Sequence, residues 1–524
     1  MQELLTPFHA AQWLHSCVTG QLHIDSRKVR AGDGFVAWPG AAVDGRAFVV
    51  DALGQGAHAC LVEAEGAGAF GLGAALTSDG VARYPGLKAA AGLIASEYFG
   101  NPTRELDVVA ITGTNGKTST AWWLAHALSN ASSSPLSNSE QTIDIPCGLV
   151  GTLGMGKPQQ GQFDLVTTGM TTPDPVLLQQ TFRDFVTGGM KACAIEASSI
   201  GLEEHRLAGT HIRCAVFTNF TQDHLDYHGS MEAYWQSKAA LFRWPGLQKA
   251  VINIDDSYGA ELAASLSNTD LDVWSVSCTQ PARLQASGIV FQNGGLCFTV
   301  TETVNKDGGT ESHHLATHLI GQYNVSNLLG VIGAMRSLGV PLAVCIQACG
   351  HLQPVPGRMT CLGGNAQPLV AVDYAHTPDA LSNALQALRP LASQRGGQLW
   401  CVFGCGGDRD PLKRPLMGAI AAQFADRVVV TSDNPRSETP QAIISQILLG
   451  LAGHEAVEVQ SDRALAIAYA LQGAAAHDVV LVAGKGHEVY QEIAGVKYPF
   501  SDEHHVALGL HAGSSDKARR EVAA

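Results

Sequence analysis

The sequence predicts an α/β protein of three domains, in which parallel strands alternate with helices. Short apolar runs typical of buried strands recur along the chain, and helical patterns stand between them. Many of these runs end in glycine-rich or charged segments, as in α/β sheets that bind ligands at their carboxyl edge. The length of 524 residues agrees with this organisation, since roughly ~150 residues make up one domain.

Two breaks divide the chain into these domains. Gly100-Asn101-Pro102 ends a predicted helix over 87–99, and the stiff segment 354–358 interrupts the later pattern. We therefore expect domains over 1–102, 103–354 and 355–524.

The composition excludes some classes of function. The chain has 46% hydrophobic and 15% charged residues, and its net charge of -14 argues against non-specific binding to nucleic acid or to an anionic membrane. The first residues lack the basic segment of a signal peptide, and no apolar run approaches the ~20 residues of a membrane span. The 12 cysteines include no C-x-x-C pair, which favours buried thiols in a reducing cytoplasm over a zinc site.

The first domain shows short elements without an evident catalytic group. Strands are expected near 22–27, 35–38 and 58–62, and helices near 48–54 and 87–99. Within the first of these strands, Asp25, Ser26 and Arg27 either contact a ligand or cap a turn.

A glycine-rich segment follows the predicted strand over 106–111. It opens a helix over 118–128, so that backbone N–H groups and a helix N-terminus can cradle phosphates. Lys117 would reach the outer phosphates, and the Thr118 hydroxyl would bind a magnesium ion. Ile111 replaces the first glycine of the full Walker pattern, yet Gly-Lys-Thr between a strand and a helix favours a nucleotide-binding loop over an ordinary turn. The residues of this loop are Gly113, Thr114, Asn115, Gly116, Lys117, Thr118 and Ser119.

Several later segments of the second domain carry polar groups. A Ser/Asn-rich stretch over 130–139 is expected to be an exposed loop. Thr172 either caps a helix that starts at Pro173 or binds a ligand. A buried strand ends at Glu196, where α/β sheets bind ligands. The segment 223–229 holds two Asp and two His residues, which form either a metal cluster or a polar loop whose side chains cap one another.

Lys238 lies on the apolar face of a helix predicted over 231–242, together with Tyr234 and Leu241. Such a lysine usually extends its ammonium to solvent. If it is buried, desolvation lowers its pKa and favours the neutral amine. A neutral amine can react with CO2 to give an anionic carbamate that binds magnesium.

The rest of the chain predicts a strand over 251–256, hairpin-like strands within 279–308 and a helix opening at 321–327. At that opening, Asn324 is a cap or a ligand group.

In the third domain, polar groups follow four strands at 369–373, 399–403, 427–431 and 478–483, which predicts a doubly wound sheet with a ligand crevice. The cations Arg409, Arg436 and Lys485 favour an anionic or zwitterionic substrate there.

Taken in order, these motifs resemble those of the Mur ligases, in particular the MurE type. The ordered set extends from Asp25 to Glu488, whereas the phosphate loop alone also occurs in folylpolyglutamate synthases. The motifs are Thr112-Gly113-Thr114-Asn115-Gly116-Lys117-Thr118, Glu196-Ala197-Ser198-Ser199, Asp223-His224-Leu225-Asp226-Tyr227-His228-Gly229, Asp373-Tyr374-Ala375-His376-Thr377-Pro378 and Asp433-Asn434-Pro435-Arg436.

The resemblance implies an N-terminal domain that holds UDP, a central P-loop ATPase-like domain and a C-terminal Rossmann-like domain. It implies an ATP-dependent ligase that adds meso-diaminopimelate to UDP-N-acetylmuramoyl-L-alanyl-D-glutamate through an acyl phosphate, in cytoplasmic peptidoglycan precursor synthesis. Such an enzyme would support cell shape and division. We expect a monomer that binds no nucleic acid and does not insert into membranes.

The resemblance also assigns roles to individual residues. Lys117, His224 and a carbamoylated Lys238 would be catalytic, and magnesium would be held by Thr118, Glu196, His224 and Lys238. ATP would contact the phosphate loop, Asn324, Arg358 and Asp373. The UDP substrate would contact Ile24, Ser26, Thr171, Thr172, Ser198, Glu204 and Arg206. Diaminopimelate would contact Arg409, Asp433, Asn434, Pro435, Arg436, Gly484 and Glu488.

Three positions depart from the family pattern, namely Met170, Ile200 and Glu204, and they put the substrate contacts there in question. Arg436 can pair with the remote carboxylate of diaminopimelate, which lysine lacks. Two alternatives remain: a ligase of the same fold that adds lysine or another amino acid, and a non-catalytic nucleotide-binding regulator.

Overall fold

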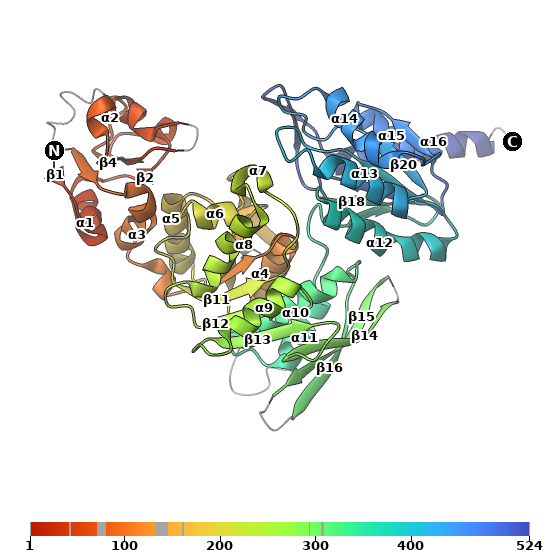
Figure 1. Ribbon diagram of the computed structural model, residues 1–524, viewed down its shortest axis with the longest axis horizontal. Coiled ribbons are helices and arrows are strands. Elements are labelled where there is room, and N and C mark those ends of the chain that lie inside the picture. Colours follow the sequence, from red (N-terminus) through yellow and green to blue (C-terminus); the bar gives the residue numbers. More distant parts are fainter. Residues whose placement is uncertain are drawn as a thin grey trace.

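The computed structural model describes residues 2–40, 43–70, 80–131, 145–159, 162–292, 294–304 and 309–522, with side chains up to residue 512. The chain forms three lobes in sequence order, and the first and third lobes stand on opposite sides of the central one (Figure 1). The N-terminal and C-terminal ends lie at the far sides of the molecule.

The N-terminal lobe has a parallel sheet of order β1-β5-β4-β3-β2, with apolar clusters on both faces. Helix α3 packs against α5 of the central lobe. The elements are β1 (Gln2–Glu3), α1 (Pro7–Cys17), β2 (Leu22–His23), β3 (Gly34–Ala37), α2 (Val49–Gly54), β4 (Ala59–Glu63), β5 (Val81–Tyr84) and α3 (Leu87–Tyr98).

The central lobe is built on an 11-stranded sheet of order β16-β15-β14-β13-β12-β11-β6-β10-β7-β8-β9. Strand β6 (Asp107–Thr112) pairs in parallel with β10 and β11, and its apolar residues alternate between the cores on the two faces. This double burial explains its continuous apolar sequence. Because the phosphate loop leaves β6, it begins in the middle of the sheet.

Helices cover both faces of this sheet (Figure 1). They are α4 (Lys117–Ala131), α5 (Pro175–Thr187), α6 (Ser199–Glu203), α7 (Leu225–His228), α8 (Met231–Ala239), α9 (Ser257–Leu266), α10 (Tyr323–Ser337) and α11 (Leu342–Gly350). The other strands are β7 (Cys147–Gly151), β8 (Gly154–Gln159), β9 (Gln162–Val166), β10 (Ala192–Glu196), β11 (Ile212–Phe217), β12 (Lys249–Asn253), β13 (Asp272–Ser277), β14 (Leu284–Gln292), β15 (Gly295–Thr303) and β16 (Thr310–Ala316).

The C-terminal lobe has a six-stranded sheet of order β17-β18-β22-β19-β20-β21, in which only β17 is antiparallel. The strands of this sheet are β17 (Thr360–Gly363), β18 (Leu369–Asp373), β19 (Leu399–Phe403), β20 (Arg427–Val430), β21 (Val457–Val459) and β22 (Val479–Ala483). A separate hairpin is formed by β23 (Tyr490–Ile493) and β24 (Val496–Pro499). The helices are α12 (Pro378–Arg395), α13 (Lys413–Phe424), α14 (Pro440–Leu448), α15 (Arg463–Gly473) and α16 (Asp502–Val522).

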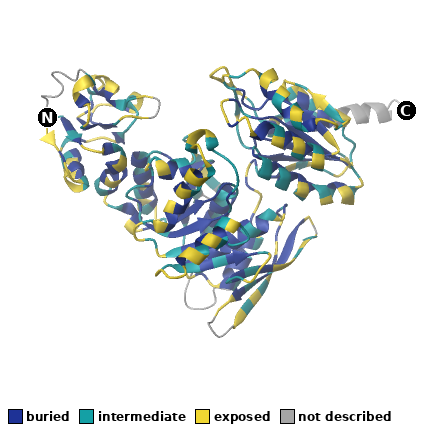
Figure 2. Cartoon of the chain, in the orientation of Figure 1, coloured by how far each residue is buried: buried dark blue, intermediate teal, exposed yellow. Residues whose placement is uncertain are grey.

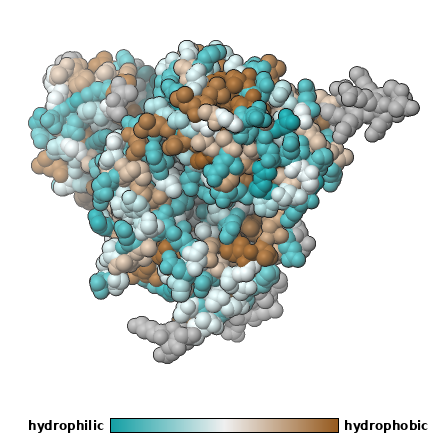
Figure 3. Space-filling model, turned by 45° about the vertical axis from the view of Figure 1, so that its right-hand side comes forward, coloured by the Kyte–Doolittle hydropathy of each residue, from teal (hydrophilic) through white to brown (hydrophobic). Residues whose placement is uncertain are grey.

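The predicted three-domain α/β class is confirmed, and the sheets form the buried interior of each lobe (Figure 2). The four predicted C-terminal strands are the adjacent parallel strands β18, β22, β19 and β20. Hydrophilic residues cover much of the face drawn in Figure 3, and hydrophobic ones form separate patches. In the described chain, no helix combines the length and apolarity that crossing a membrane requires.

Some local predictions are corrected. Helix α5 begins at Pro175 and is capped by Asp174, so Thr172 is not its cap. Asn324 lies inside α10, one residue after its start, and is not a cap either. The segment 130–139 begins within α4, and its residues from 132 lie outside the described part.

Candidate active site

A cavity of about 1450 Å³ lies between the central and C-terminal lobes. Both lobes line it, because the loops after β6, β10 and β11 face those after β18, β19, β20 and β22. Predicted residues that line it from the central lobe are Thr114, Asn115, Gly116, Lys117, Thr118, Ser119, Thr171, Glu196, Ser198, Arg206, His224, Lys238 and Asn324. From the C-terminal side, Arg358, Asp373, Arg409, Asp433, Asn434, Arg436, Gly484 and Glu488 line it.

The phosphate loop needs its two glycines. Gly113 has φ +144° and Gly116 has φ +86°, and an added Cβ would collide with Thr218 at the first position and with Asn327 at the second. The Thr218 hydroxyl donates to the Asn115 carbonyl (2.6 Å), and the Asn115 N–H donates to Asn219 Oδ1 (2.9 Å). The loop after β11 therefore buttresses the phosphate loop, a role for Thr218 and Asn219 that sequence reasoning missed.

Lys117 folds back onto its own loop. Its ammonium donates to the carbonyls of Gly113 (2.9 Å) and Thr114 (2.8 Å), and burial lowers its pKa. The ammonium therefore lies within the phosphate loop. Phosphate oxygens bound in this loop would take the place of the two carbonyls as its hydrogen-bond partners.

Glu196 and Thr118 form a cluster of oxygens beside this loop. The Thr118 hydroxyl donates to Glu196 Oε2 at 2.9 Å, and the Thr152 N–H donates to Oε1 at 2.7 Å. Arg358, from the C-terminal side of the cavity, donates to Thr118 Oγ1 at 3.2 Å. A hydroxyl and a carboxylate are ligands that Mg²⁺ uses together with phosphate oxygens and water, so these residues fit the ion.

Lys238 is buried, with 1% of the residue exposed. Its ammonium donates to the Gly113 carbonyl (2.7 Å) and lies 4.5 Å from the centre of the Tyr234 ring. Burial and the neighbouring Lys117 hold the pKa of Lys238 well below its usual range. The extended, solvent-exposed alternative is therefore wrong, and the neutral amine is favoured.

The segment 223–229 is not a metal cluster. Asp223 faces His224 (3.5 Å) and His376 (3.9 Å), while Asp226 and His228 have other partners. In the ranges that the structure describes, no three His, Cys, Asp or Glu side chains form a group that could hold a metal. Burial lowers the pKa of His224 to about 4, so its imidazole is neutral at pH 7.

Thr171, Thr172, Ser198 and Arg206 lie on the N-terminal side of this cavity. Thr172 donates to the Glu196 carbonyl (2.8 Å), and Arg206 donates to the Thr172 carbonyl (3.0 Å). Ser198 Oγ caps α6 and lies 2.9 Å from Thr172 Oγ1. Thr171, Ser198 and Arg206 line the cavity, whereas Thr172 is buried behind them and is hydrogen-bonded to Ser198 and Arg206.

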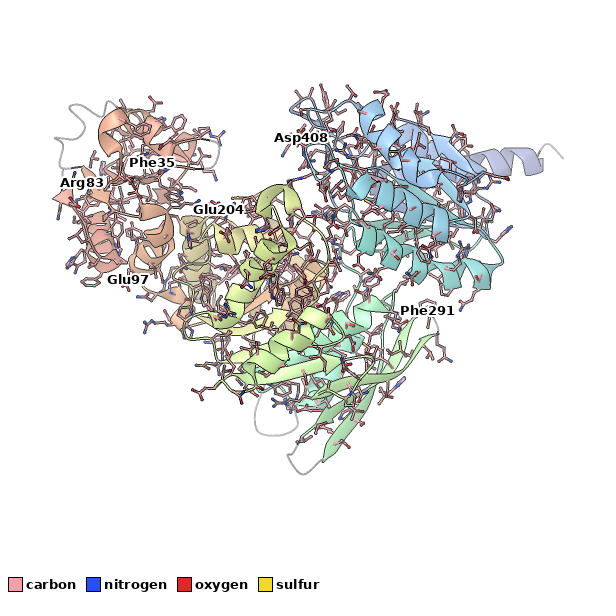
Figure 4. All side chains as sticks on the ribbon, in the orientation of Figure 1. Phe35, Arg83, Glu97, Glu204, Phe291 and Asp408 are labelled. Atoms are coloured by element: carbon pink, nitrogen blue, oxygen red, sulfur yellow. The ribbon has the colours of Figure 1, made fainter. Side chains whose placement is uncertain are left out.

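The N-terminal residues predicted to bind UDP do not reach the cavity. Ile24 packs against the N-terminal core, and Ser26 begins a 3-10 turn that Asp25 caps. Glu204 lies at the edge of the central lobe that faces the N-terminal lobe (Figure 4), where it pairs with Lys88 at 2.7 Å. Glu204 therefore joins the two lobes.

A second polar group occupies the C-terminal end of the cavity. Asn434 Nδ2 donates to Glu488 Oε2 (2.8 Å), and Lys485 donates to the same oxygen (2.8 Å).

Arg436 has φ +50°, and its guanidinium donates to the Gly407 carbonyl (2.7 Å). Asp433 is buried, and an added Cβ at Gly484 would collide with its carboxylate. Pro435 is buried nearby and does not line the cavity.

Contacts also join the cavity's two sides. Arg409 pairs with Asp226 of α7 (3.2 Å), and its neighbour Asp408 lies on the side of the C-terminal lobe toward α7 (Figure 4). Asp373 accepts the N–H groups of Met359 and Ala375, both at 2.8 Å, so it fixes the connection between the lobes. Asn324 donates to the Ile320 carbonyl at 2.7 Å.

The chain matches three family models: the Mur ligase family catalytic domain over residues 20–90, the Mur ligase middle domain over 111–335, and the Mur ligase glutamate ligase domain over 357–486. Two similar proteins are named UDP-N-acetylmuramoyl-L-alanyl-D-glutamate--2,6-diaminopimelate ligase. That of Acidovorax sp. (strain JS42) is 60% identical over 97% of this chain and 98% of its own. That of Pseudomonas aeruginosa is 46% identical over 92% of this chain and 93% of its own.

Solved structures agree. A structure with the same name is 34% identical, with a TM-score of 0.61 over 94% of this chain and 95% of that one. MurF from Acinetobacter baumannii is 16% identical with a TM-score of 0.64 over 97% of this chain and 99% of that one, which shows the shared fold. The chain belongs to the Mur ligase family.

Proposed function

We propose that the protein is the ATP-dependent ligase that joins meso-diaminopimelate to UDP-N-acetylmuramoyl-L-alanyl-D-glutamate in peptidoglycan precursor synthesis. The observation that carries the proposal is that one cavity has the phosphate loop at one end and, at the other, a pocket lined by charged side chains of both signs, including Arg436. Relatives that share this name over nearly their whole length support the choice of substrates.

The reaction makes an amide in two steps. The substrate carboxylate attacks the γ-phosphorus of ATP, which forms an acyl phosphate and releases ADP. The amine of the incoming amino acid then attacks the acyl carbon, loses a proton and displaces phosphate. Both steps need positioning and charge neutralisation more than covalent help from the protein.

The residues divide these tasks between them. Lys117 and the N–H groups of the phosphate loop would hold the phosphates, and Arg358 would add charge from the other side. Thr118 and Glu196 would hold a magnesium ion, which neutralises phosphate charge when bound. Asn324 and Asp373 would complete the ATP site across the lobes.

Lys238 is proposed to carry a carbamate. Its neutral nitrogen would form a bond to the carbon of CO2 and lose one proton, so that a neutral amine becomes an anionic carbamate. The anion would support a second metal together with His224. The low pKa of Lys238 and its position beside Lys117 support this assignment.

Arg436 is proposed to select the amino acid. Its guanidinium can donate two parallel hydrogen bonds to the remote carboxylate of diaminopimelate, whereas lysine has no such carboxylate and would leave it with the Gly407 carbonyl and Glu492 (3.7 Å) as partners. Asp433 and Glu488 would receive the ammonium groups, Asn434 would hold Glu488 in place, and Arg409 would receive the other carboxylate. Ile24, Ser26, Thr171, Thr172, Ser198 and Arg206 would hold the nucleotide substrate.

Phosphate release tests the proposal. It should require ATP, the nucleotide substrate and meso-diaminopimelate together, and lysine should not replace the last. Equal turnover with lysine would favour a lysine-adding ligase. ATP binding without turnover on any acceptor would favour a regulator.

Chemical rescue tests the carbamate. Lys238→Ala should lose activity because the second metal loses its anionic support, and short carboxylates such as formate should restore part of it. Lys249→Ala serves as a control, because Lys249 lies outside the cavity and its ammonium donates to the Ser337 carbonyl. Absence of rescue by every short carboxylate would contradict the carbamate.

A further inference from the structure

Lys485 is a buried cation in the amino-acid pocket to which the proposed function assigns no role. Its side chain is 0% exposed, and its ammonium donates to Asn434 Oδ1 (3.0 Å) and Glu488 Oε2 (2.8 Å). Asn434 follows β20 and Glu488 follows β22, so the ammonium connects two loops of the pocket.

We propose that Lys485 is a positioning residue, which holds Asn434 and Glu488 in the orientation that receives the incoming amino acid. The inference rests on the proposed function, because it assigns the pocket to a zwitterionic substrate. Lys485 itself would not touch that substrate.

The contacts of Asn434 fix its amide. Its oxygen accepts from Lys485 and from the N–H of Glu492 (2.9 Å), and its nitrogen donates to Glu488. A rotation that exchanged oxygen and nitrogen would place N–H groups against both donors. The cation therefore fixes which end of the amide faces Glu488.

The contacts of Glu488 likewise separate its two oxygens. The donors from Lys485 and Asn434 both reach Oε2, and the residue lines the cavity. We assign Oε1 to the incoming ammonium. The adjacent cation balances a carboxylate that would otherwise be an unpaired charge in a largely buried pocket.

The backbone explains why this lysine points inward. Gly484 has φ +119° and Gly486 has φ +51°, and an added Cβ would collide with Asp433 at the first position and with the Gly357 backbone at the second. The loop therefore passes close to its neighbours on both sides of Lys485. Its side chain is buried, and its ammonium lies between the loops that follow β20 and β22.

Stability alone is a weak reason for this arrangement. Replacing a buried ion pair by an apolar side chain of similar size often leaves stability unchanged, because the desolvation cost offsets the attraction. Lys485→Met is close in length but removes only one partner of the pair, which by itself lowers stability. The Glu488 side chain that remains is 16% exposed and keeps its hydrogen bond from Asn434, so we expect the variant to fold with reduced stability and to lose affinity for one substrate.

Steady-state kinetics of the full chain test the proposal. Lys485→Met should raise the KM for meso-diaminopimelate roughly tenfold or more, whereas kcat and the KM for ATP change less than about threefold, because only uniform binding of the amino acid is lost. Lys485→Arg, which keeps charge and donors, should recover part of the affinity. The control Lys191→Met, at an exposed position outside the cavity, should resemble the wild type.

A double-mutant cycle separates positioning from direct contact. In a Glu488→Gln background, Lys485→Met should cost less than about threefold in the same KM, since the lysine acts in large part through Glu488. An equal cost in both backgrounds would overturn the inference. So would an unchanged KM for meso-diaminopimelate, or equal changes in the KM values of all three substrates.

The same assay keeps the two proposals apart. Wild-type turnover with meso-diaminopimelate and an unaffected Lys485→Met would reject only the positioning role. Wild-type protein that does not use the amino acid would reject the proposed function and the inference with it. If Lys485→Met does not fold, Lys485→Gln, which keeps a donor without the charge, provides the same comparison.

Discussion

At the scale of single residues, Arg436, which we propose selects the amino acid, has an unusual backbone conformation. A non-glycine residue at φ +50° is strained, and such strain persists where surrounding contacts hold it. Here the N–H of Arg436 donates to the Glu492 carbonyl (3.0 Å), and its carbonyl accepts from Ala494 (2.7 Å). The β23–β24 hairpin thus fixes the direction of the guanidinium.

Arg436→Met should lower kcat/KM for meso-diaminopimelate roughly 100-fold, or about 3 kcal/mol, because the remote carboxylate loses its bidentate partner. Weak activity with lysine should change little, since lysine has no such carboxylate. Steady-state assays with both amino acids measure the ratio. Arg389→Met removes the ion pair with Asp426 outside the cavity and is the matched control. A similar loss with both amino acids would contradict the specificity role.

At the scale of an element, α4 combines Lys117, the proposed phosphate-binding lysine, with a half-buried histidine. His126 lies beside the rings of Trp122 (5.0 Å) and Phe163 (4.6 Å between centres). Burial lowers its pKa to about 4. The folded state therefore disfavours the cationic form.

This burial predicts a pH dependence of stability. Between the ordinary pKa of 6.5 and the folded value of about 4, the unfolded chain binds a proton that the folded chain does not. The free energy of unfolding is therefore highest above pH 6.5 as far as His126 is concerned, and it decreases as the pH falls toward 4. The cost at pH 5 relative to pH 7.5 is about 2 kcal/mol.

His126→Phe removes this titration and keeps an aromatic ring. The variant should therefore gain stability relative to the wild type on going from pH 7.5 to pH 5, as measured by denaturant unfolding at the two values. His9→Phe, in α1 and exposed, is the control. A constant difference between variant and wild type at both pH values would show that His126 does not titrate as proposed.

At the scale of the whole molecule, the C-terminal lobe contacts the phosphate loop and the loop before α7 directly. Asn115 donates to Asp379 of α12 (3.0 Å), and Gln222 donates to Asp410 (3.2 Å). The first of these contacts connects the lobes at the end of the cavity where ATP is proposed to bind. Substrate-dependent closure commonly uses such contacts.

Asp379→Ala should raise the KM for ATP roughly fivefold, about 1 kcal/mol, because one hydrogen bond that holds the lobes together is lost. The melting temperature should stay within about 2 °C for a chain of this size. Gln386→Ala is the control, because it removes an exposed hydrogen bond within the same helix. An unchanged KM for ATP would show that the contact does not support nucleotide binding.

The sequence predicted much of the fold because buried strands and their polar ends are local patterns. The strand before the phosphate loop and the four C-terminal strands followed from apolar runs and the residues after them. Thr218 and Asn219 escaped notice, because only the pairing of β11 with β6 brings them to the loop. Of the two alternatives left open at Thr172 and Asn324, the structure excludes the helix cap, because Asp174 caps α5 and Asn324 lies inside α10.

The sequence by itself determined the fold class, the phosphate loop and the ordered motifs of a Mur ligase, because each of these depends on residues close together in the chain. Only the tertiary structure decided that Lys238 is buried, that the Asp and His side chains of residues 223–229 have separate partners, and that Lys485 lies between two loops. These features depend on segments far apart in sequence, since burial and charge pairing are set by what the fold brings together.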